Sequence, residues 1–306
     1  MTDTTSQPEG RRSPAQKAAA QMAAAQMKAS RKAAARKTPV LHVPGNRAFS
    51  HKRRFASLRT ITALMLREMA TTNGRTPGGY LWAVLEPVAG IALLSAIFSV
   101  AFRNPALGTN FPLFFATGMI PFVLFSTVSA KLAQAINFSK PLLAYPSVTF
   151  LDAILARFIL NTLTEIMVAY IVFTGILLIF ETRVIIDIPT IAMSLVLAAA
   201  LSLGVGTLNC FLFTRFPIWQ QAWSILMRPM FIISGVFLLY DHLPRLVQEW
   251  LWYNPLIHVV GLARRGFYIT YDAPYVSVGY VLGFSAVCFV LGLVLLRRYQ
   301  HALLNI

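Results

Sequence analysis

Between Arg67 and Val88 the chain reads REMATTNGRTPGGYLWAVLEPV. A polar, charged segment passes through a Gly/Pro-rich turn at residues 74–79 into a hydrophobic run led by Tyr80 and Trp82. Gly and Pro interrupt helices, and aromatic side chains are enriched where helices enter a membrane. This segment therefore predicts a helix on a membrane surface, a break, and then a helix that crosses the membrane.

The composition of the whole chain supports a membrane protein. It has 306 residues, of which 57% are hydrophobic and 12% charged, and its mean hydropathy is +0.62. A soluble domain carries roughly 25% charged residues. Several apolar runs also approach the ~20 residues that a membrane helix needs. We therefore expect an all-α integral membrane protein.

The basic charge is concentrated at the N-terminus. Residues 1–60 hold 13 of the 27 Lys and Arg residues, against only Asp3 and Glu9. Anionic lipid headgroups are a sufficient partner for such a segment, so we expect contact with membrane lipids and no nucleic acid. Residues 1–40 lack the apolar core of a cleavable signal peptide. The single cysteines, Cys210 and Cys288, indicate no disulfide framework.

The pattern divides the chain into three parts. Residues 1–50 form a basic, Ala/Lys-rich cytoplasmic extension, residues 51–79 an interfacial helix and hinge, and residues 80–306 the transmembrane domain. From Ser57 to Ala70 apolar residues recur at helical spacing among arginines, which is typical of an amphipathic helix lying in the interface. The apolar positions are Leu58, Ile61, Leu64, Met65 and Met69.

Hydropathy predicts six spans in the transmembrane domain. They cover residues 81–102, 113–131, 150–180, 188–213, 223–240 and 276–296. Lys and Arg outside the spans are concentrated on one side, which predicts that both termini are cytoplasmic. Arg245, Arg264 and Arg265, between the fifth and sixth spans, are exceptions to this rule.

The segment from Asp241 to Tyr275 is too polar to span the membrane. Non-helical backbone survives at membrane depth only inside protein or beside water. We expect a re-entrant pair of short helices that dips in from the outer face, with Trp250, Trp252 and Tyr253 at the headgroup level.

No catalytic pattern is visible. The chain lacks G-x-x-x-x-G-K-[ST], the loop that cradles nucleotide phosphates, and its five histidines are scattered singly. We expect a non-catalytic chain with no catalytic residue, cofactor or metal of its own.

Polar residues inside the third span are more informative. Arg157, Asn161 and Glu165 are spaced i, i+4 and i+8, so they share one helical face. Charges at membrane depth should face protein or water. Two interpretations stay open: a structural ion pair that clamps helices, or the lining of a hydrated substrate path. Glu86, before Pro87, and Arg228, before Pro229, allow the same two interpretations.

The residues at the membrane entrance resemble a known family. Leu66-Arg67-Glu68 and the run GYLWAVLEP from Gly79 to Pro87 resemble the start of ABC-2 type permeases of polysaccharide exporters. Further blocks at 111–122, 140–157 and 252–260 resemble the same family in the same order. The pattern is most similar to the permease subunit of bacterial capsular-polysaccharide exporters.

This resemblance implies partners and a location. It implies a homodimer in the bacterial inner membrane with two ATP-binding cassette subunits, which would bind ATP and Mg. It also implies export of a lipid-linked acidic polysaccharide, and periplasmic and outer-membrane export proteins as further partners. Rival cargoes are O-antigen, teichoic acid, another lipid-linked glycan, or a small lipid or drug. A membrane-embedded transferase is a rival of another class.

The resemblance also suggests roles for particular residues. The segment 137–148 would include the helix that couples to the ATPase, although a plain loop is the alternative; its residues are Lys140, Pro141, Tyr145 and Pro146. Sugar rings stack on aromatic faces, and the substrate-path candidates besides the third-span triad are Phe98, Phe102, Phe122 and Phe125. A gate hinge is expected at Arg67, Gly74, Gly78 and Gly79. The re-entrant segment would centre on Trp252, Tyr253, Asn254 and Pro255.

Overall fold

The computed structural model describes residues 22–30, 56–73, 78–143, 149–182 and 184–304. The chain divides into two units, residues 1–54 and 55–306. In the first, residues 22–30 form an exposed helix. In the second, all regular structure among the described residues is helical.

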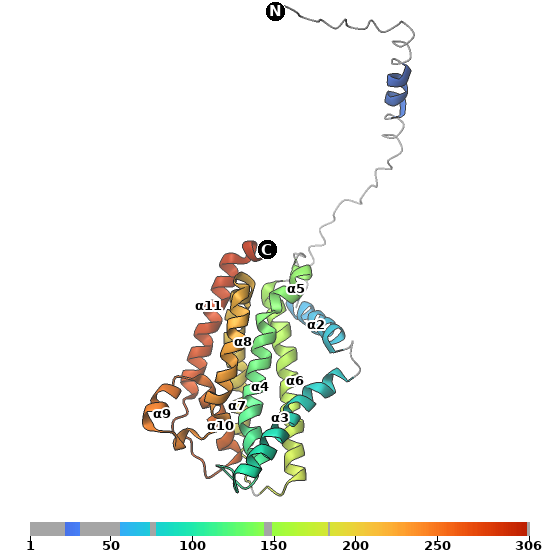
Figure 1. Ribbon diagram of the computed structural model, residues 1–306. Coiled ribbons are helices and arrows are strands. Elements are labelled where there is room, and N and C mark those ends of the chain that lie inside the picture. The colour runs from blue at the N-terminus through green and yellow to red at the C-terminus, as the bar shows by residue number, and fades with distance from the viewer. Residues whose placement is uncertain (1–21, 31–55, 74–77, 144–148, 183, 305–306) are drawn as a thin grey trace, which may run out of the picture. The chain divides into compact units, whose positions relative to one another are not determined.

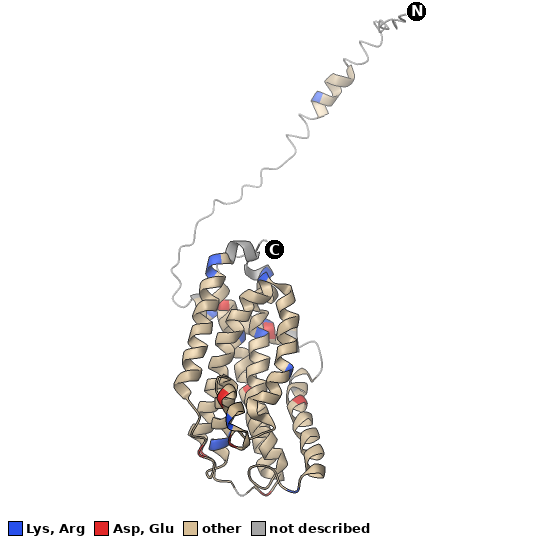
Figure 2. Ribbon diagram, turned by 60° about the vertical axis from the view of Figure 1, so that its left-hand side comes forward, with Lys and Arg blue, Asp and Glu red and all other residues tan. Residues whose placement is uncertain are grey.

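Five helices are long and apolar enough to cross a membrane. They form the bundle in Figure 1: α3 (Gly79–Ala101), α4 (Phe111–Ala133), α6 (Phe150–Ile179), α7 (Ile188–Arg215) and α11 (Val278–Leu304). Their positions agree with the predicted first, second, third, fourth and sixth spans to within a few residues, except that α11 continues eight residues beyond the predicted end at 296. Charged residues are sparse along them (Figure 2), as a hydrocarbon environment requires.

The predicted fifth span differs from what the structure shows. Helix α8 (Pro217–Phe231) begins six residues earlier than expected and continues into the π-helix η2 (Ile232–Val236). Gly235, the residue before the last one of η2, interrupts the helical conformation with a φ of 82°, a left-handed conformation that favours glycine. The helical segment therefore stops before the expected end at Tyr240.

The buried Arg264 stabilises this break. It lies on α10 (Pro255–Phe267), and its guanidinium donates to the carbonyls of Val236 at 3.0 Å and Leu238 at 3.1 Å. Helix ends leave carbonyls without partners, and these two bonds satisfy the carbonyl of Val236, the last residue of η2, and that of Leu238 just beyond it. The same side chain lies 4.5 Å from the ring centroid of Phe114. Arg264 thus caps a helix end inside the protein. This role explains why Arg264 is an exception to the concentration of Lys and Arg on one side of the membrane.

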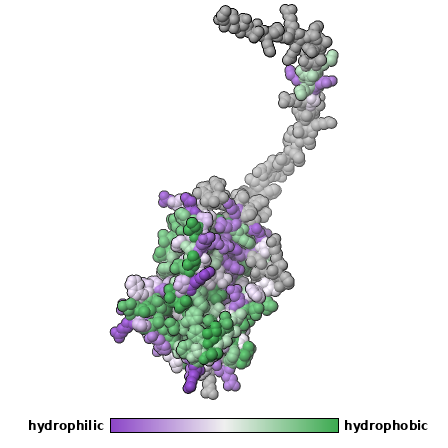
Figure 3. All heavy atoms as spheres, viewed as in Figure 1, coloured by the Kyte–Doolittle hydropathy of each residue, from purple (hydrophilic) through white to green (hydrophobic). Residues whose placement is uncertain are grey.

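Short helices complete the domain. Helix α2 (Ala56–Glu68) runs into the π-helix η1 (Met69–Asn73), and α5 (Ala135–Leu143) follows α4. The expected pair of short helices before the last span corresponds to α9 (Arg245–Leu251) and α10, preceded by the 3-10 turn η3 (Tyr240–His242). Apolar side chains cover much of the lower body in Figure 3, while polar ones gather toward the end that carries α2 and α5.

Helix α7 is the centre of the packing, against α4, α10 and α11. Small residues allow its backbone to approach these neighbours closely. A Cβ at Gly204 would come within 2.3 Å of the Ser285 carbonyl oxygen on α11, and one at Gly292 within 2.7 Å of the Leu208 nitrogen. These contacts place α7 and α11 side by side as one rigid pair.

Candidate functional site

A buried ion pair joins the interfacial helix to the third long helix. The Nε of Arg157, on α6, lies 2.9 Å from Oε1 of Glu68 at the end of α2. Their side chains are only 8% and 4% exposed. Glu68 is the one buried position among the described side chains of α2, so this pair fixes how α2 lies against α6.

Arg157 also contacts two further elements. Its Nη1 donates to the carbonyl of Lys131 at 3.0 Å, near the end of α4. Its guanidinium lies 4.3 Å from the ring centroid of Phe138 on α5, and Arg67 approaches the same ring at 5.5 Å. One arginine therefore contacts α2, α4 and α5 from its place on α6.

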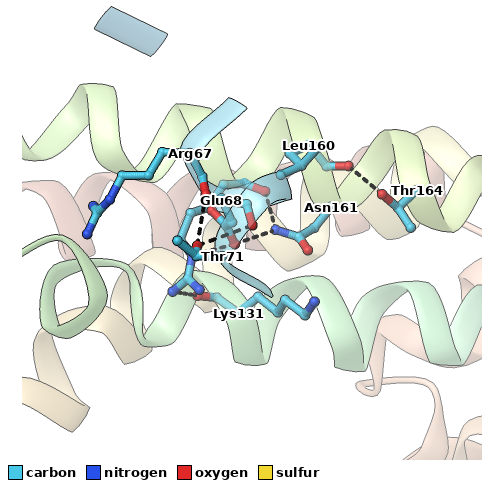
Figure 4. Close-up of polar contacts among 8 residues, drawn as sticks. Arg67, Glu68, Thr71, Lys131, Leu160, Asn161 and Thr164 are labelled. Atoms are coloured by element: carbon cyan, nitrogen blue, oxygen red, sulfur yellow. Dashed lines mark hydrogen bonds and ion pairs between the residues drawn. The ribbon is translucent and has the colours of Figure 1, made fainter. Parts of the chain in front are cut away.

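Asn161 extends this cluster by one helical turn. Its Nδ2 donates to the Arg157 carbonyl at 2.7 Å and lies 3.5 Å from Oε1 of Glu68. Figure 4 shows Glu68 pointing toward Asn161 while Lys131 lies across from them on the neighbouring helix. The polar face predicted for the third span is thus turned into the protein at this level.

Beside this cluster lies a cavity of about 250 Å³ with both polar and apolar side chains in its lining. It is bounded by α2, α3, α4 and α6, and Trp82 lies at its edge with 67% of its surface exposed. Its charged and amide lining residues are Glu68, Glu86, Lys131, Asn161 and Glu165. Thr127 and Thr164 add hydroxyls.

The cavity has the chemistry to bind a neutral or hydroxyl-rich group. Three carboxylates and one ammonium face it, and Glu68 is already paired with Arg157. Carboxylates, amides and hydroxyls hydrogen-bond to hydroxyl groups, and the indole of Trp82 offers an apolar face. Among the described residues no group of three or more His, Cys, Asp or Glu is placed to hold a metal ion.

A family model for the ABC-2 type transporter matches residues 59–268, which is more than half of the chain. The chain belongs to this family. It is therefore a membrane permease, a non-catalytic transport component that associates with an ATPase subunit in an exporter.

The chain aligns with nearly the whole length of several individual relatives. The polysialic acid transport protein KpsM of Escherichia coli is 33% identical over 80% of this chain and 95% of its own. The capsule polysaccharide export inner-membrane proteins CtrC of Neisseria meningitidis and BexB of Haemophilus influenzae are 26% and 25% identical, over 79% of this chain and 91% of theirs. With its five long apolar helices, this permease is a multi-pass inner-membrane protein.

The aromatic path candidates lie apart from the cavity, and none of them lines it. Phe122 and Phe125 are 7% and 2% exposed and belong to the core around α7. Phe98 packs on Phe115 with ring centroids 5.0 Å apart, and the exposed Phe102 stacks on Phe98 at 5.8 Å. Of the substrate-path residues proposed from sequence, the structure brings Asn161 and Glu165 together at the cavity, beside Arg157.

The other predicted sites are described only in part. Lys140 and Pro141 lie in the last turns of α5, whereas Tyr145 and Pro146 fall outside the described residues. In the hinge, Gly74 also falls outside them. Gly78 precedes α3 with a φ of 89°, and Gly79 is the first residue of that helix.

The segment around Trp252 is held by a network of hydrogen bonds. The Trp252 indole donates to the Tyr275 carbonyl at 3.2 Å, and the Trp252 carbonyl lies 2.8 Å from Nε2 of His258. Asn254 caps α10 by accepting from the Leu256 nitrogen at 3.1 Å, and Pro255 is the first residue of that helix. Tyr253 is exposed, but its carbonyl accepts from Tyr280.

Sequence reasoning missed Glu68, Lys131 and Phe138 as site residues. Glu68 follows Leu64 and Met65 by four and three residues, so it occupies a position on the apolar stripe of α2. An acid on such a stripe is a detectable sign of a buried partner. The roles of Lys131 and Phe138 depend on long-range contacts and carry no comparable local sign.

Proposed function

We propose that this permease is the membrane subunit of an ATP-driven exporter that moves lipid-linked capsular polysaccharide across the inner membrane. The observation that carries the proposal is its nearly full-length similarity to proteins named for polysialic acid transport and capsule polysaccharide export. The hydroxyl-binding cavity between α2, α3, α4 and α6 supports a glycan as cargo.

The proposed assembly is a homodimer with two ATP-binding cassette subunits, which bind ATP and Mg. In this assembly α8 and η2 together make the fifth of six crossings, and both termini are cytoplasmic. The two short helices α9 and α10 form the re-entrant segment. One residue, Phe216, separates the end of α7 from the start of α8, so in this proposal the chain reverses at that membrane face. Periplasmic and outer-membrane export proteins would receive the polymer.

In this proposal α5 and the residues after it contact the ATPase. Helix α5 lies at the same end as α2 (Figure 1), and its ring at Phe138 touches the Arg157 guanidinium. A movement of α5 would therefore reach α2 and α6 through one side chain. Residues 51–79 would act as the gate, and residues 1–50 as an extension outside the transmembrane domain.

The direct test is deletion of the gene followed by location of the polysaccharide. We expect polymer to accumulate inside the cells, and the wild-type gene to restore surface polymer. Polymer that still reached the surface of the deletion strain would overturn the proposal. Loss of O-antigen or teichoic acid from the surface, with the capsule intact, would assign the rival cargo instead.

A narrower test concerns the coupling segment. Replacing Lys140 and the residues up to Tyr145 is expected to reduce copurification of the ATPase subunit, because this segment would provide the docking surface. Unchanged copurification would remove the coupling assignment without affecting the assignment of the cargo.

A further inference from the structure

Helix α8 is the most exposed of the long helices in the bundle. None of its residues is buried, although α8 packs against α7 and η2. Figure 1 shows it running along the bundle rather than across its end. Such exposure is ordinary for a lipid-facing helix, but α8 is not uniformly apolar.

An α-helix turns by 100° per residue, and on this basis the side chains of α8 fall on three faces. Met227 and Met230 are partly buried and pack against the core around α7. Ile218, Ile225 and Leu226 are 81%, 65% and 46% exposed and make an apolar face suited to lipid. A polar stripe lies between these two faces, and we define it as Gln220, Gln221, Ser224 and Arg228.

In the proposed fifth crossing, which runs from Pro217 to Val236, the stripe reaches the middle of the helix. Arg228 follows Pro217, the first residue of α8, by eleven residues. At a rise of 1.5 Å per residue this is about 17 Å, or roughly half of a hydrocarbon core of ~30 Å. In that proposed crossing the guanidinium therefore starts from a backbone position near the centre of the bilayer.

Arg228 differs from two other arginines of the bundle. Arg157 is paired with Glu68, and Arg264 donates to two carbonyls. Arg228 is exposed and has no hydrogen-bond or ion-pair partner among the described residues. The ion-pair interpretation therefore holds for Arg157 but finds no support within the protomer for Arg228.

An exposed charge at this depth cannot face lipid cheaply. The remaining choices are water or a second copy of the chain. Gln220, Gln221 and Arg228 also place two amides and a guanidinium on the same face, and guanidinium binds carboxylates through paired, charge-assisted hydrogen bonds. Amides and hydroxyls suit the hydroxyl groups of sugars.

We propose that the α8 stripe faces a water-filled path and binds the acidic groups of the glycan that passes along it, with Arg228 as the anion-binding residue. This inference rests on the proposed function. It places the binding of acidic groups on α8, because the acidic cavity is poorly suited to bind them. The cavity holds three carboxylates against the single ammonium of Lys131, so its lining disfavours an anionic polymer, whereas the only charge on the stripe is positive.

Accessibility of single cysteines tests the wet face. The native Cys210 and Cys288 are buried and would be changed to alanine in the full chain, assembled with its ATPase subunit in membrane vesicles. Because the thiolate is the reactive form, Ser224→Cys and Arg228→Cys should react with a charged, membrane-impermeant thiol reagent about tenfold faster than Ile225→Cys and Leu226→Cys. Equal rates at all four positions would overturn the proposal. Unreactive stripe cysteines that form disulfides between copies would also overturn it.

Protection experiments test the ligand. Oligogalacturonate, with a carboxylate on every sugar, should slow labelling of Ser224→Cys, and maltooligosaccharide of equal length should not. Arg228→Gln should weaken that protection by about tenfold, and Arg228→Lys by less, because the charge-assisted bonds depend on the cation. Protection by phosphatidylglycerol added to phosphatidylcholine vesicles, with none from oligogalacturonate, would overturn the glycan assignment. Labelling does not depend on the natural cargo, so its failure is distinct from failure of the gene-deletion test.

Discussion

The Arg157 guanidinium holds several elements together because its donors point in different directions. Nε faces Glu68 on α2, Nη1 faces the carbonyl of Lys131, and the planar face covers Phe138. Lysine has one compact charged group and could not make all three contacts. The pair is also buried, so neither charge can be compensated by water if the other is removed.

Glu68→Ala is expected to destabilise the permease by about 3–5 kcal/mol, because Arg157 would remain buried without its counterion. Thermal unfolding of the purified protein in detergent measures the effect. Arg59→Ala is the matched control, since Arg59 lies exposed on the same helix and should leave the melting temperature unchanged. A Glu68→Leu/Arg157→Met double variant should recover much of the loss. Equal melting of Glu68→Ala and wild type would contradict the stabilising role of the pair.

The local sequence predicted the polar face of the third span but not its partner. The spacing of Arg157 and Asn161 is visible because helical periodicity is a property of neighbouring residues. Glu68 precedes Arg157 by 89 residues, and nothing in the intervening sequence specifies that the two meet. Buried contacts of this kind arise from tertiary packing, which single-sequence patterns do not encode.

At the scale of elements, α7 and α11 pack closely because glycines at their contact carry no side chain. Gly204→Ala would drive a methyl group into the Ser285 carbonyl at 2.3 Å, so the helices must separate at a cost of about 1–3 kcal/mol. Gly283→Ala on α11 is the control, because nothing lies within 4 Å of its Cβ position. Yield and melting temperature of the detergent-solubilised protein should fall only for Gly204→Ala. A similar loss in both variants would show that helix separation is not the cause.

Helix α5 offers a second prediction about elements. Phe138→Leu keeps an apolar side chain but removes the aromatic face beneath Arg157 and Arg67, an interaction worth about 0.5–2 kcal/mol. We expect ATPase copurification to persist while polymer export falls several-fold. Phe138→Tyr should retain export because it keeps the ring. Export that is normal in Phe138→Leu would show that α5 does not act through this contact.

The element that sequence reasoning placed least well was the predicted span at 223–240. Hydropathy continues through Phe237 and Leu239, so the pattern gives no reason to stop. The helix ends because Gly235 adopts a left-handed conformation and Arg264 supplies the hydrogen bonds that the free carbonyls need. A cap from a residue 26 to 28 positions later leaves no local signal.

For the whole molecule, hydropathy succeeded where the physical requirement is simple. A helix that crosses a membrane must be apolar over a fixed length, and five of the predicted spans correspond to single long helices. Their mutual arrangement depends on glycine contacts and buried polar groups, such as the approach of Gly204 to α11, which hydropathy does not register. The sequence therefore predicted the class of fold better than the packing of its site.

For the whole molecule, the concentration of basic residues near the N-terminus leads to a last prediction. Residues 1–50 carry nine Lys and Arg against Asp3 and Glu9, and they belong to a unit separate from the bundle. Deleting them should leave the melting temperature unchanged, because the described core lies entirely within residues 55–306. Binding to phosphatidylglycerol should weaken, since each basic residue near an anionic surface contributes about 1 kcal/mol. Native mass spectrometry with mixed lipids measures that preference. A deletion that lowered the melting temperature would show that the extension helps to stabilise the bundle, and unchanged lipid preference would show that its charges do not contact lipid.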